Sequence, residues 1–312
     1  MLIESSTPSA IANKAPHSAP ILRRVFNDDF LNETFRRDGA IVVPLLSSLE
    51  VTNLIDFFQR EQKDAALGFH ATMFSADVGY RTRVDHIVRA MMLPKLLPYL
   101  HAYRAVVGNF VVKEPSRRDS AVPVHQDWTF VDETKMHSLN VWCPLIDTTP
   151  ENGRLHVFKG SHRLMQVLRG PYFPNPYVSN SKMIAEHFMT ELALDAGMAV
   201  IYDHALVHAS PANRSGALRI AANLALVPEE AQLIHAYLES DTGNTPGRPE
   251  IFQVEDAFFL QNVIGERPSE TGSPFNSLGT VVPRAISLGF ADPVVGIEPE
   301  ELSRLFDCRQ AA

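Results

Sequence analysis

The chain has 312 residues, of which 45% are hydrophobic and 21% are charged, so it is long and apolar enough to bury a large core. Its 36 acidic residues outnumber its 28 basic residues, and the formal charge of −8 at pH 7 argues against nucleic acid or an anionic membrane as its main partner. Cys143 and Cys308 are too few cysteines for a disulfide framework, and no apolar run approaches membrane-spanning length. We therefore expect a cytoplasmic protein that acts on a small molecule, with an oligomeric state that the sequence leaves open.

The N-terminal segment differs in composition from the rest of the chain. Residues 1–20 are rich in Ser, Ala and Pro and poor in large apolar side chains, which is typical of a flexible leader. No further shift in composition follows, so we expect residues 21–312 to form a single domain. Apolar residues at helical spacing over 28–35 predict a helix that stops at Gly39, and residues 40–46 predict a buried strand.

The next part of the chain has one clear helix signal and one weak stretch. Ser47 and Glu50 have the spacing of a capping box, which predicts that a second helix begins there. Residues 68–92 mix aromatic, basic and methionine side chains with weak periodicity, which predicts irregular structure along a pocket wall. A third helix is predicted over 94–106.

Short strands dominate the remainder. We predict them at 107–114, 123–127, 138–146, 154–158, 192–203, 218–227 and 233–239. Because turns rather than regular helices join them, they favour a mainly β protein, an antiparallel sandwich or barrel with helices packed outside. The insertions at 169–190 and 240–290 are too long for plain turns and are expected to act as lids.

The strand-like stretch around His125 carries a candidate metal site. His125 and Asp127 are two residues apart, so on a strand both side chains point to the same face. An imidazole and a carboxylate that converge in this way are two of the three ligands of a non-haem Fe(II) facial triad, and His208, at the end of another apolar run, is the predicted third. Such a triad leaves one face of the metal open for a co-substrate and dioxygen. Taken alone, the His125–Asp127 pattern is also compatible with an ordinary surface pair.

An arginine inside an apolar strand adds a second signal. Arg219 lies eleven residues after His208, and Ser210 lies two residues after it. A buried guanidinium is costly unless a carboxylate meets it, and its planar fork suits a bidentate grip on a carboxylate. A dicarboxylate co-substrate would supply that anion. Alternatively, Arg219 pairs with an internal Asp or Glu, or reaches the edge of the sheet.

Several short motifs together resemble one family. They are Pro123-Val124-His125-Gln126-Asp127, then Glu151-Asn152-Gly153-Arg154-Leu155 followed by Gly160-Ser161-His162, and then His208-Ala209-Ser210 with Asn213 and Arg219. In order and spacing they are similar to the phytanoyl-CoA dioxygenase family of Fe(II)/2-oxoglutarate-dependent oxygenases, over about residues 25 to 230. The resemblance implies a double-stranded β-helix, that is, a cupin-like jelly roll.

The resemblance also implies a set of site residues. Iron would be held by His125, Asp127 and His208, which are then the catalytic residues. Arg219 and Ser210 would bind the distal carboxylate of 2-oxoglutarate. By the same resemblance Asn109 would help to hold the other end of the co-substrate, unless it merely closes a strand edge with Lys113. Asn140, on the strand after the metal site, is a further candidate for the co-substrate, and Trp142 shares its face, although both could instead belong to the core.

The reaction that the resemblance implies is a dioxygenase reaction. Fe(II), 2-oxoglutarate and O2 would hydroxylate a C–H bond, with release of succinate and carbon dioxide. Desaturation, epoxidation and cyclisation remain open alternatives within the same chemistry. Halogenation is disfavoured, because related halogenases have a small residue in place of the Asp127 carboxylate.

The substrate is the least defined part of this interpretation. Aromatic side chains in the candidate walls favour a partly apolar small molecule, such as a natural product or an amino-acid-like compound, which could be free or carrier-bound. The candidate substrate-binding residues are Phe74, Arg83, Trp128 and Tyr172. Two hypotheses from other classes remain: a non-catalytic, cupin-like metal- or ligand-binding protein, and a zinc hydrolase, for which Asp203 might be proposed as a general base.

Overall fold

The computed structural model describes residues 23–62, 68–164, 167–238, 249–262, 265, 267–268 and 276–280. The leader predicted at 1–20 lies outside the described residues, as does much of the insertion predicted at 240–290. The fold that follows is that of the described part of the chain.

The first two helices form where the local sequence predicts them. Helix α1 spans Asp29–Asp38, strand β1 spans Ala40–Pro44 and helix α2 spans Ser48–Glu61. Gly39 ends α1 in the left-handed region with φ of 77°, as a glycine C-cap does. The Ser47 hydroxyl accepts from the Glu50 amide while the Glu50 carboxylate accepts from the Ser47 amide, so the predicted capping box is confirmed.

The next region corrects two predictions. Strand β2 spans Phe69–Ala71, and then a long helix, α3, spans Val78–Leu96, where irregular structure was predicted. The helix predicted over 94–106 is wrong, because strand β3 begins at Tyr103. Two polar residues of α3, Arg81 and Asp85, are buried, so the helix lacks the one-sided apolar stripe that reveals a helix in a sequence.

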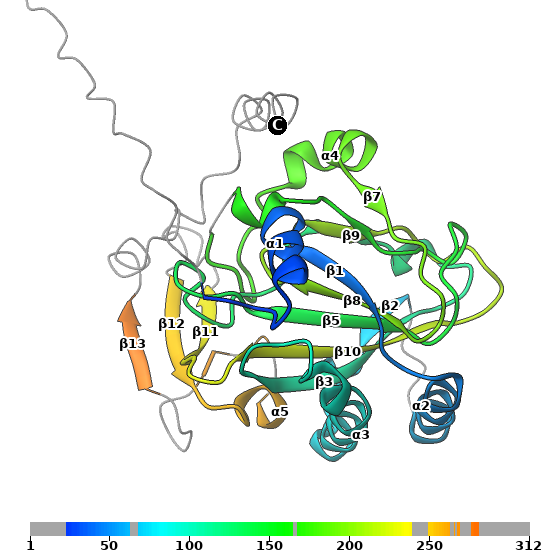
Figure 1. The fold of residues 1–312 in the computed structure, drawn as a ribbon, viewed down its shortest axis with the longest axis horizontal. Coiled ribbons are helices and arrows are strands. Elements are labelled where there is room, and N and C mark those ends of the chain that lie inside the picture. The colour runs from blue at the N-terminus through cyan, green and yellow to red at the C-terminus, as the bar shows by residue number, and fades with distance from the viewer. Residues whose placement is uncertain are drawn as a thin grey trace, which may run out of the picture.

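Two antiparallel sheets stack on each other (Figure 1). The six-stranded sheet has the order β1–β8–β5–β10–β3–β2, and its remaining strands are β5 (Leu139–Pro144), β8 (Met198–Asp203), β10 (Arg219–Pro228) and β3 (Tyr103–Lys113). The four-stranded sheet has the order β4–β9–β6–β7, made of Val122–His125, His208–Ser210, His156–Val157 and Thr190–Glu191. The predicted mainly β fold, a jelly roll with flanking helices, is confirmed.

A third sheet follows the jelly roll in the chain. Its order is β11–β12–β13, which span Leu233–Leu238, Pro249–Val254 and Asn276–Thr280. The two remaining α-helices of the described residues are α4 (Ser181–His187) and α5 (Phe258–Gln261), and 3-10 turns lie at Thr72–Phe74, Arg118–Ser120, Ser161–Arg163 and Val178–Asn180. Parts of both predicted lids are therefore regular structure. Their movement as lids, and the single domain over 21–312, stay predictions.

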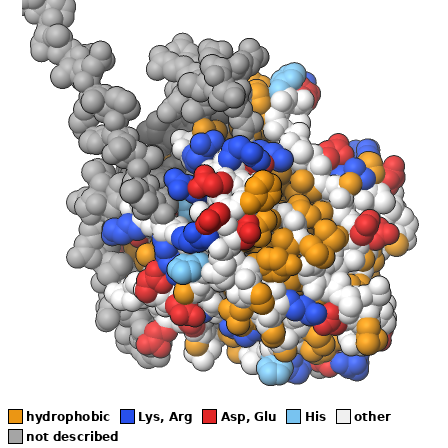
Figure 2. All heavy atoms as spheres, in the orientation of Figure 1, with side chains coloured by type: hydrophobic (Ala, Val, Ile, Leu, Met, Phe, Trp, Pro, Cys, Tyr) orange, Lys and Arg blue, Asp and Glu red, His pale blue; other side chains and the backbone are white. Residues whose placement is uncertain are grey.

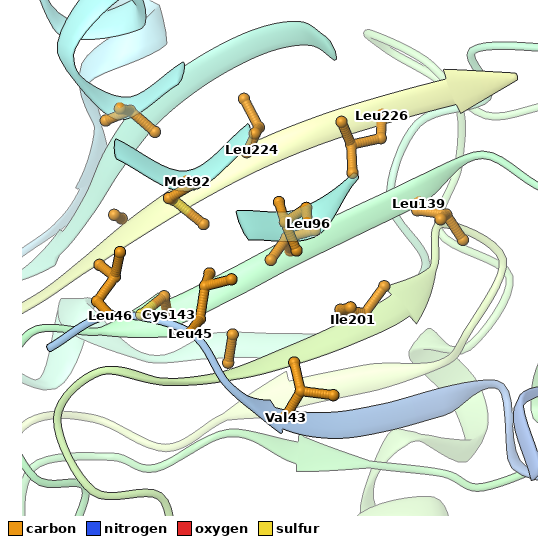
Figure 3. Close-up of a cluster of buried hydrophobic side chains, with 14 of the residues drawn as sticks. Val43, Leu45, Leu46, Met92, Leu96, Leu139, Cys143, Ile201, Leu224 and Leu226 are labelled. Carbon is orange, nitrogen blue, oxygen red and sulfur yellow. The ribbon is translucent and has the colours of Figure 1, made fainter. Parts of the chain in front are cut away.

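The alternation of side chains along the central strands separates the core from a cavity. Leu139, Val141 and Cys143 of β5 point to the helices, as do alternate residues of β10 such as Leu224 and Leu226. Figure 3 shows Cys143, Leu224 and Leu226 around Met92 and Leu96 of α3. The intervening residues of both strands, including Asn140 and Arg219, point to the other face and line a cavity between the two sheets.

On the face drawn in Figure 2, acidic and basic side chains of the described residues are intermixed around an apolar area. Among the helices of the described part, none has the length and hydropathy needed to cross a membrane.

The capping box of α2 gives the first testable prediction. Ser47→Ala removes the side-chain acceptor for the Glu50 amide, so we expect the free energy of unfolding to fall by about 1 kcal/mol in urea denaturation. Ser48→Ala, an exposed serine one residue later, is the matched control and should change stability by a few tenths of that amount. Equal effects in the two variants would contradict the capping role.

Candidate metal centre

The pairing of two short strands brings the predicted ligands together. β4 and β9 are antiparallel neighbours, and His125 lies directly opposite His208 in their register. Asp127 follows the end of β4, and its Oδ1 lies 3.6 Å from the Nε2 atom of each histidine. The ligand atoms of the three residues all lie within 4.8 Å of one another, so His125, Asp127 and His208 could hold one metal ion.

Hydrogen bonds of the two histidines determine which ring nitrogen of each one faces the candidate metal position. Nδ1 of His125 lies 2.8 Å from the Pro123 carbonyl, and Nδ1 of His208 lies 2.9 Å from the Leu206 carbonyl. A carbonyl only accepts, so each Nδ1 carries the proton and each Nε2 keeps its lone pair. Burial, together with the neighbouring His125, lowers the pKa of His208 to about 4, so this imidazole is neutral at pH 7. The three residues therefore fit a divalent metal.

The carboxylate of Asp127 is oriented by two donors on the large sheet. Asn140 Nδ2 donates to Oδ2 of Asp127 at 2.8 Å, and the Tyr202 hydroxyl donates to the same oxygen at 3.2 Å. Asn140 also donates to the Tyr202 hydroxyl at 2.9 Å. With Oδ2 held in this way, Oδ1 is the oxygen that faces the two histidines. Asn140 thus contacts a predicted metal ligand, and its predicted role in co-substrate binding stays a prediction.

The backbone of Asp127 is held from a different part of the chain. Its amide donates to the His204 carbonyl at 3.0 Å, and its carbonyl accepts from Nε of Arg169 at 2.6 Å. Arg169 also forms a buried ion pair with Glu133, with N–O distances of 2.5 and 2.9 Å. Position 169 begins the first predicted lid, so that end of the insertion is anchored beside the metal site.

Arg219, the first residue of β10, is buried and has no carboxylate partner among the described residues. One of its nitrogens, Nη1, donates to the Gly153 carbonyl at 2.8 Å and to the Ser210 hydroxyl at 3.1 Å, and its guanidinium lies 5.2 Å from the centre of the Trp142 ring. Burial lowers its pKa to about 9, so it stays charged at pH 7.

The turn that offers its carbonyl to Arg219 requires a glycine. Gly153 has φ of 75°, and a Cβ there would lie 2.1 Å from the Pro211 carbonyl oxygen, so only glycine fits this turn.

A buried lysine lies beside Arg219. Lys113 is opposite Arg219 in the register of β3 and β10, and its Nζ donates to the carbonyls of Ser210 and Pro211, the first at 2.8 Å. Burial and the charge of Arg219 lower the pKa of Lys113 to about 6, so this amine is mostly neutral at pH 7. The charge that suits this end of the sheet to an anion is therefore that of Arg219.

A cavity of about 240 Å³ joins these groups. Its described lining includes the three candidate ligands, Arg219, Ser210 and a predominantly apolar wall of Phe69, Ala71, Met73, Phe74, Val107, Val111, Trp128, Phe130, Trp142 and Ala225. Predicted wall residues from 68–92 are therefore part of the cavity, although the region is not irregular throughout.

The four predicted substrate residues divide into two pairs. Phe74 and Trp128 both line the cavity and meet edge to face, with ring centres 6.0 Å apart. Arg83 and Tyr172 are outside its described lining: Arg83 pairs with Glu61 at 3.0 Å, and Tyr172 is exposed and packs on Tyr237. Their positions give no support to a substrate role.

Four residues near the site are not among the functional residues that the sequence predicts. Tyr202 and Arg169 hold Asp127, Lys113 is predicted only to close a strand edge, and Asn223 lines the cavity. Asn223 is four residues after Arg219 on the same strand face, which is a signal that the sequence does contain. Its partner across the sheet, Asn109, was predicted to bind the co-substrate.

The hydrogen bonds to Asp127 generate a prediction for metal affinity. Asn140→Leu removes the shorter bond, and we expect the affinity for Fe(II) or Ni(II) to fall about 10- to 100-fold in an anaerobic competition titration. Tyr202→Phe removes only the longer bond and should have the smaller effect. Unchanged affinity in Asn140→Leu, with an unchanged unfolding midpoint, would show that Asp127 is oriented by other contacts.

The buried lysine generates a pH dependence. The pKa of Lys113 is about 6 in the folded chain, against an ordinary value of 10.5. Between these pH values the unfolded chain binds more protons, so this residue makes the free energy of unfolding rise with pH, by at most about 1.4 kcal/mol per unit. Lys113→Met should lack this contribution, so urea denaturation at pH 6.5 and 9.0 should show a smaller rise than in the unsubstituted protein. Parallel pH profiles would contradict the lowered pKa.

Three solved structures are among those that match part of this chain. The epimerase SnoN, in complex with Fe3+, alpha-ketoglutarate and nogalamycin RO, is 20% identical with a TM-score of 0.49, covering 66% of this chain and 85% of that one. The carbocyclase SnoK from nogalamycin biosynthesis is 19% identical with a TM-score of 0.49, covering 70% and 89%. HygX from Streptomyces hygroscopicus, with nickel, 2-oxoglutarate and hygromycin B bound, is 15% identical with a TM-score of 0.46, covering 65% and 88%.

The amino-acid sequence of the chain is similar to that of a known protein and to one family model. A phytanoyl-CoA dioxygenase domain-containing protein 1 from Danio rerio is 26% identical over 144 residues, which are 44% of this chain. The matched region spans about half of that relative, 49% of its length. The family model for phytanoyl-CoA dioxygenase (PhyH) matches residues 46–221, which include all three candidate ligands and Arg219. The chain belongs to the phytanoyl-CoA dioxygenase family.

Proposed function

We propose that the protein is an Fe(II)- and 2-oxoglutarate-dependent dioxygenase. The observation that carries this proposal is the placement of two unlike sites in one cavity. A cluster of two imidazoles and a carboxylate lies in the same cavity as a buried arginine that has no carboxylate partner among the described residues. A molecule with a metal-chelating end and a carboxylate end matches both sites, and 2-oxoglutarate has this form.

The donor set favours iron among the common metals. Two imidazoles and one carboxylate that leave coordination positions open are the facial triad of non-haem Fe(II) oxygenases. Bound iron with 2-oxoglutarate supplies the oxidising chemistry, in which dioxygen is consumed and succinate and carbon dioxide are released. The chain itself holds Asp127 through Asn140 and offers Arg219 and Ser210 to the distal carboxylate. The predicted role of Asn109 at the other end of the co-substrate stays a prediction.

The reaction that we propose is hydroxylation of an unactivated C–H bond in a small, partly apolar molecule, such as a natural product or an amino-acid-like compound. The predominantly apolar wall of the cavity supports a substrate of this kind. The protein's contribution is to hold one C–H bond near the metal and to keep water away from it. Desaturation, epoxidation or cyclisation would use the same arrangement.

The zinc hydrolase alternative lacks a described general base. Asp203, the residue that might serve, accepts a hydrogen bond from His137 and another from the Ala205 amide at 2.8 Å. Its carboxylate is buried and does not line the cavity. These contacts indicate that Asp203 holds the loop before β9 in place.

An anaerobic titration tests the proposal. Metal-free protein receives Fe(II) and then 2-oxoglutarate, and we expect the weak visible charge-transfer band of an iron-chelated 2-oxo acid. In Arg219→Met the affinity for 2-oxoglutarate should fall on the order of 10- to 100-fold, because charge-assisted hydrogen bonds are lost. The matched control is Arg154→Met, which removes an arginine that already pairs with Glu191 at 3.3 Å.

The charge-transfer band and the affinity for 2-oxoglutarate together separate the competing functions. Iron binding without the band would favour a binding protein or a hydrolase over the oxygenase. A band that forms equally well in Arg219→Met would leave the metal assignment intact and show that another group anchors the co-substrate. A similar loss in Arg154→Met would point to a general effect of charge.

A further inference from the structure

Two asparagines lie opposite each other on neighbouring strands in one wall of the cavity. Asn109 of β3 lies directly opposite Asn223 of β10, and both line the cavity. They are only 1% and 9% exposed, and the carbonyl oxygen of each has no hydrogen-bond partner among the described residues. Side chains directly opposite in an antiparallel pair lie close together, so the two amides form one polar patch.

Asn140, in the same cavity, also has a carbonyl oxygen without a described partner, whereas two buried asparagines outside its described lining have partners. The side chain of Asn152 accepts from the Thr149 amide at 2.8 Å and donates to the Asp147 carbonyl at 2.8 Å. Asn213 likewise accepts from Ser215 and donates to two backbone carbonyls. A buried amide that is left unsatisfied costs stability, so a pair retained on a cavity wall calls for a partner that enters the cavity.

The order of strands places this patch among apolar residues of the large sheet. Asn140 and Tyr202, which hold Asp127, are on β5 and β8 at one side of β10. On the other side, β3 pairs with β2, which contributes Phe69 and Ala71 to the cavity. Trp142 of β5 is opposite Asn223 and also lines the cavity, so a molecule that covers this apolar wall would contact the amides.

The charge of the cavity restricts the class of molecule. Among the described lining residues, Asp127 and Arg219 are the only Asp, Glu, Lys or Arg, and the proposed function assigns them to metal and co-substrate. An asparagine both donates and accepts, and its amide can turn either atom toward the cavity. The best complement is a neutral group that also does both, such as an amide or a lactam.

We propose that Asn109 and Asn223 form a substrate subsite that binds the amide or lactam group of an uncharged, otherwise apolar molecule. The proposal deepens the proposed function and rests on it, because it assumes that Arg219 is taken by the co-substrate. It replaces the predicted co-substrate role of Asn109 with a substrate role.

Three probes of one shape and different polarity test this subsite. They are 2-quinolinone, which carries a lactam, naphthalene, which lacks it, and 2-naphthoate, which is an anion. Binding is measured by ligand-observed NMR under anaerobic conditions, with and without Fe(II) and 2-oxoglutarate. With Fe(II) and 2-oxoglutarate bound, we expect 2-quinolinone to bind roughly three- to tenfold more tightly than naphthalene, as one or two neutral hydrogen bonds provide, and 2-naphthoate to bind least because Arg219 is then occupied.

The variants assign the preference to the two asparagines. Asn223→Leu and Asn109→Leu should each remove the preference for the lactam and keep the unfolding midpoint equal or higher, because an unsatisfied amide is replaced by an apolar group of similar size. Asn223→Asp, which keeps the size of the side chain but loses the hydrogen-bond donor, should also lower the preference for the lactam. Val107→Leu, a change in the neighbouring wall, is the matched control and should alter the affinity for 2-quinolinone and naphthalene alike.

The outcomes distinguish this proposal from the proposed function. The subsite is overturned if the lactam binds no better than naphthalene, or if its preference survives Asn223→Leu. It is also overturned if Asn109→Leu weakens 2-oxoglutarate and leaves the preference unchanged. The charge-transfer band in the same protein reports separately on the oxygenase assignment, and its absence would remove that assignment whatever the probes do.

Discussion

Strand β10 is buried on both faces, and the alternation of its side chains decides where the core and the site lie. Ile220, Ala222, Leu224 and Leu226 pack toward the helices in one hydrophobic cluster. Arg219 and Asn223 point the other way, into the cavity between the sheets. A shift of one residue in register would place a guanidinium in the apolar core, which is far more costly than the loss of a single contact. The packing of α3 on this sheet therefore also fixes the site.

Electrostatics at the two ends of the cavity differ in a way that suits an elongated anion. At one end the negative charge of Asp127 is held by neutral donors and faces two imidazoles, so a cation completes it. At the other end Arg219 has no described carboxylate, and burial together with its charge lowers the pKa of Lys113. Arg219 is buried and Asp127 half-buried, and neither pairs with a described side chain of fixed opposite charge, which is the usual sign of a functional site rather than a structural ion pair. By contrast, Glu133 and Arg169 satisfy each other and serve to hold the backbone of Asp127.

Much of the site could be predicted because its signals are local. The parity of His125 and Asp127, the arginine within an apolar strand and the capping box at Ser47 all depend on a few neighbouring residues. The position of α3 could not be predicted, because buried Arg81 and Asp85 conceal its periodicity. Arg83 and Tyr172 were chosen as substrate residues for their chemistry alone, and the fold turns them away from the cavity toward Glu61 and Tyr237.

The sequence by itself determined the β class of the fold, the strands that bear the ligands and the residue types that point to a metal and an anion, since these follow from side-chain alternation and chemistry. Only the tertiary structure decided which strands are neighbours. The pairing of β4 with β9 makes His125 meet His208, and the pairing of β3 with β10 sets Asn109 against Asn223. Register between strands about 80 to 110 residues apart is chosen by packing over the whole sheet, and no local propensity records it.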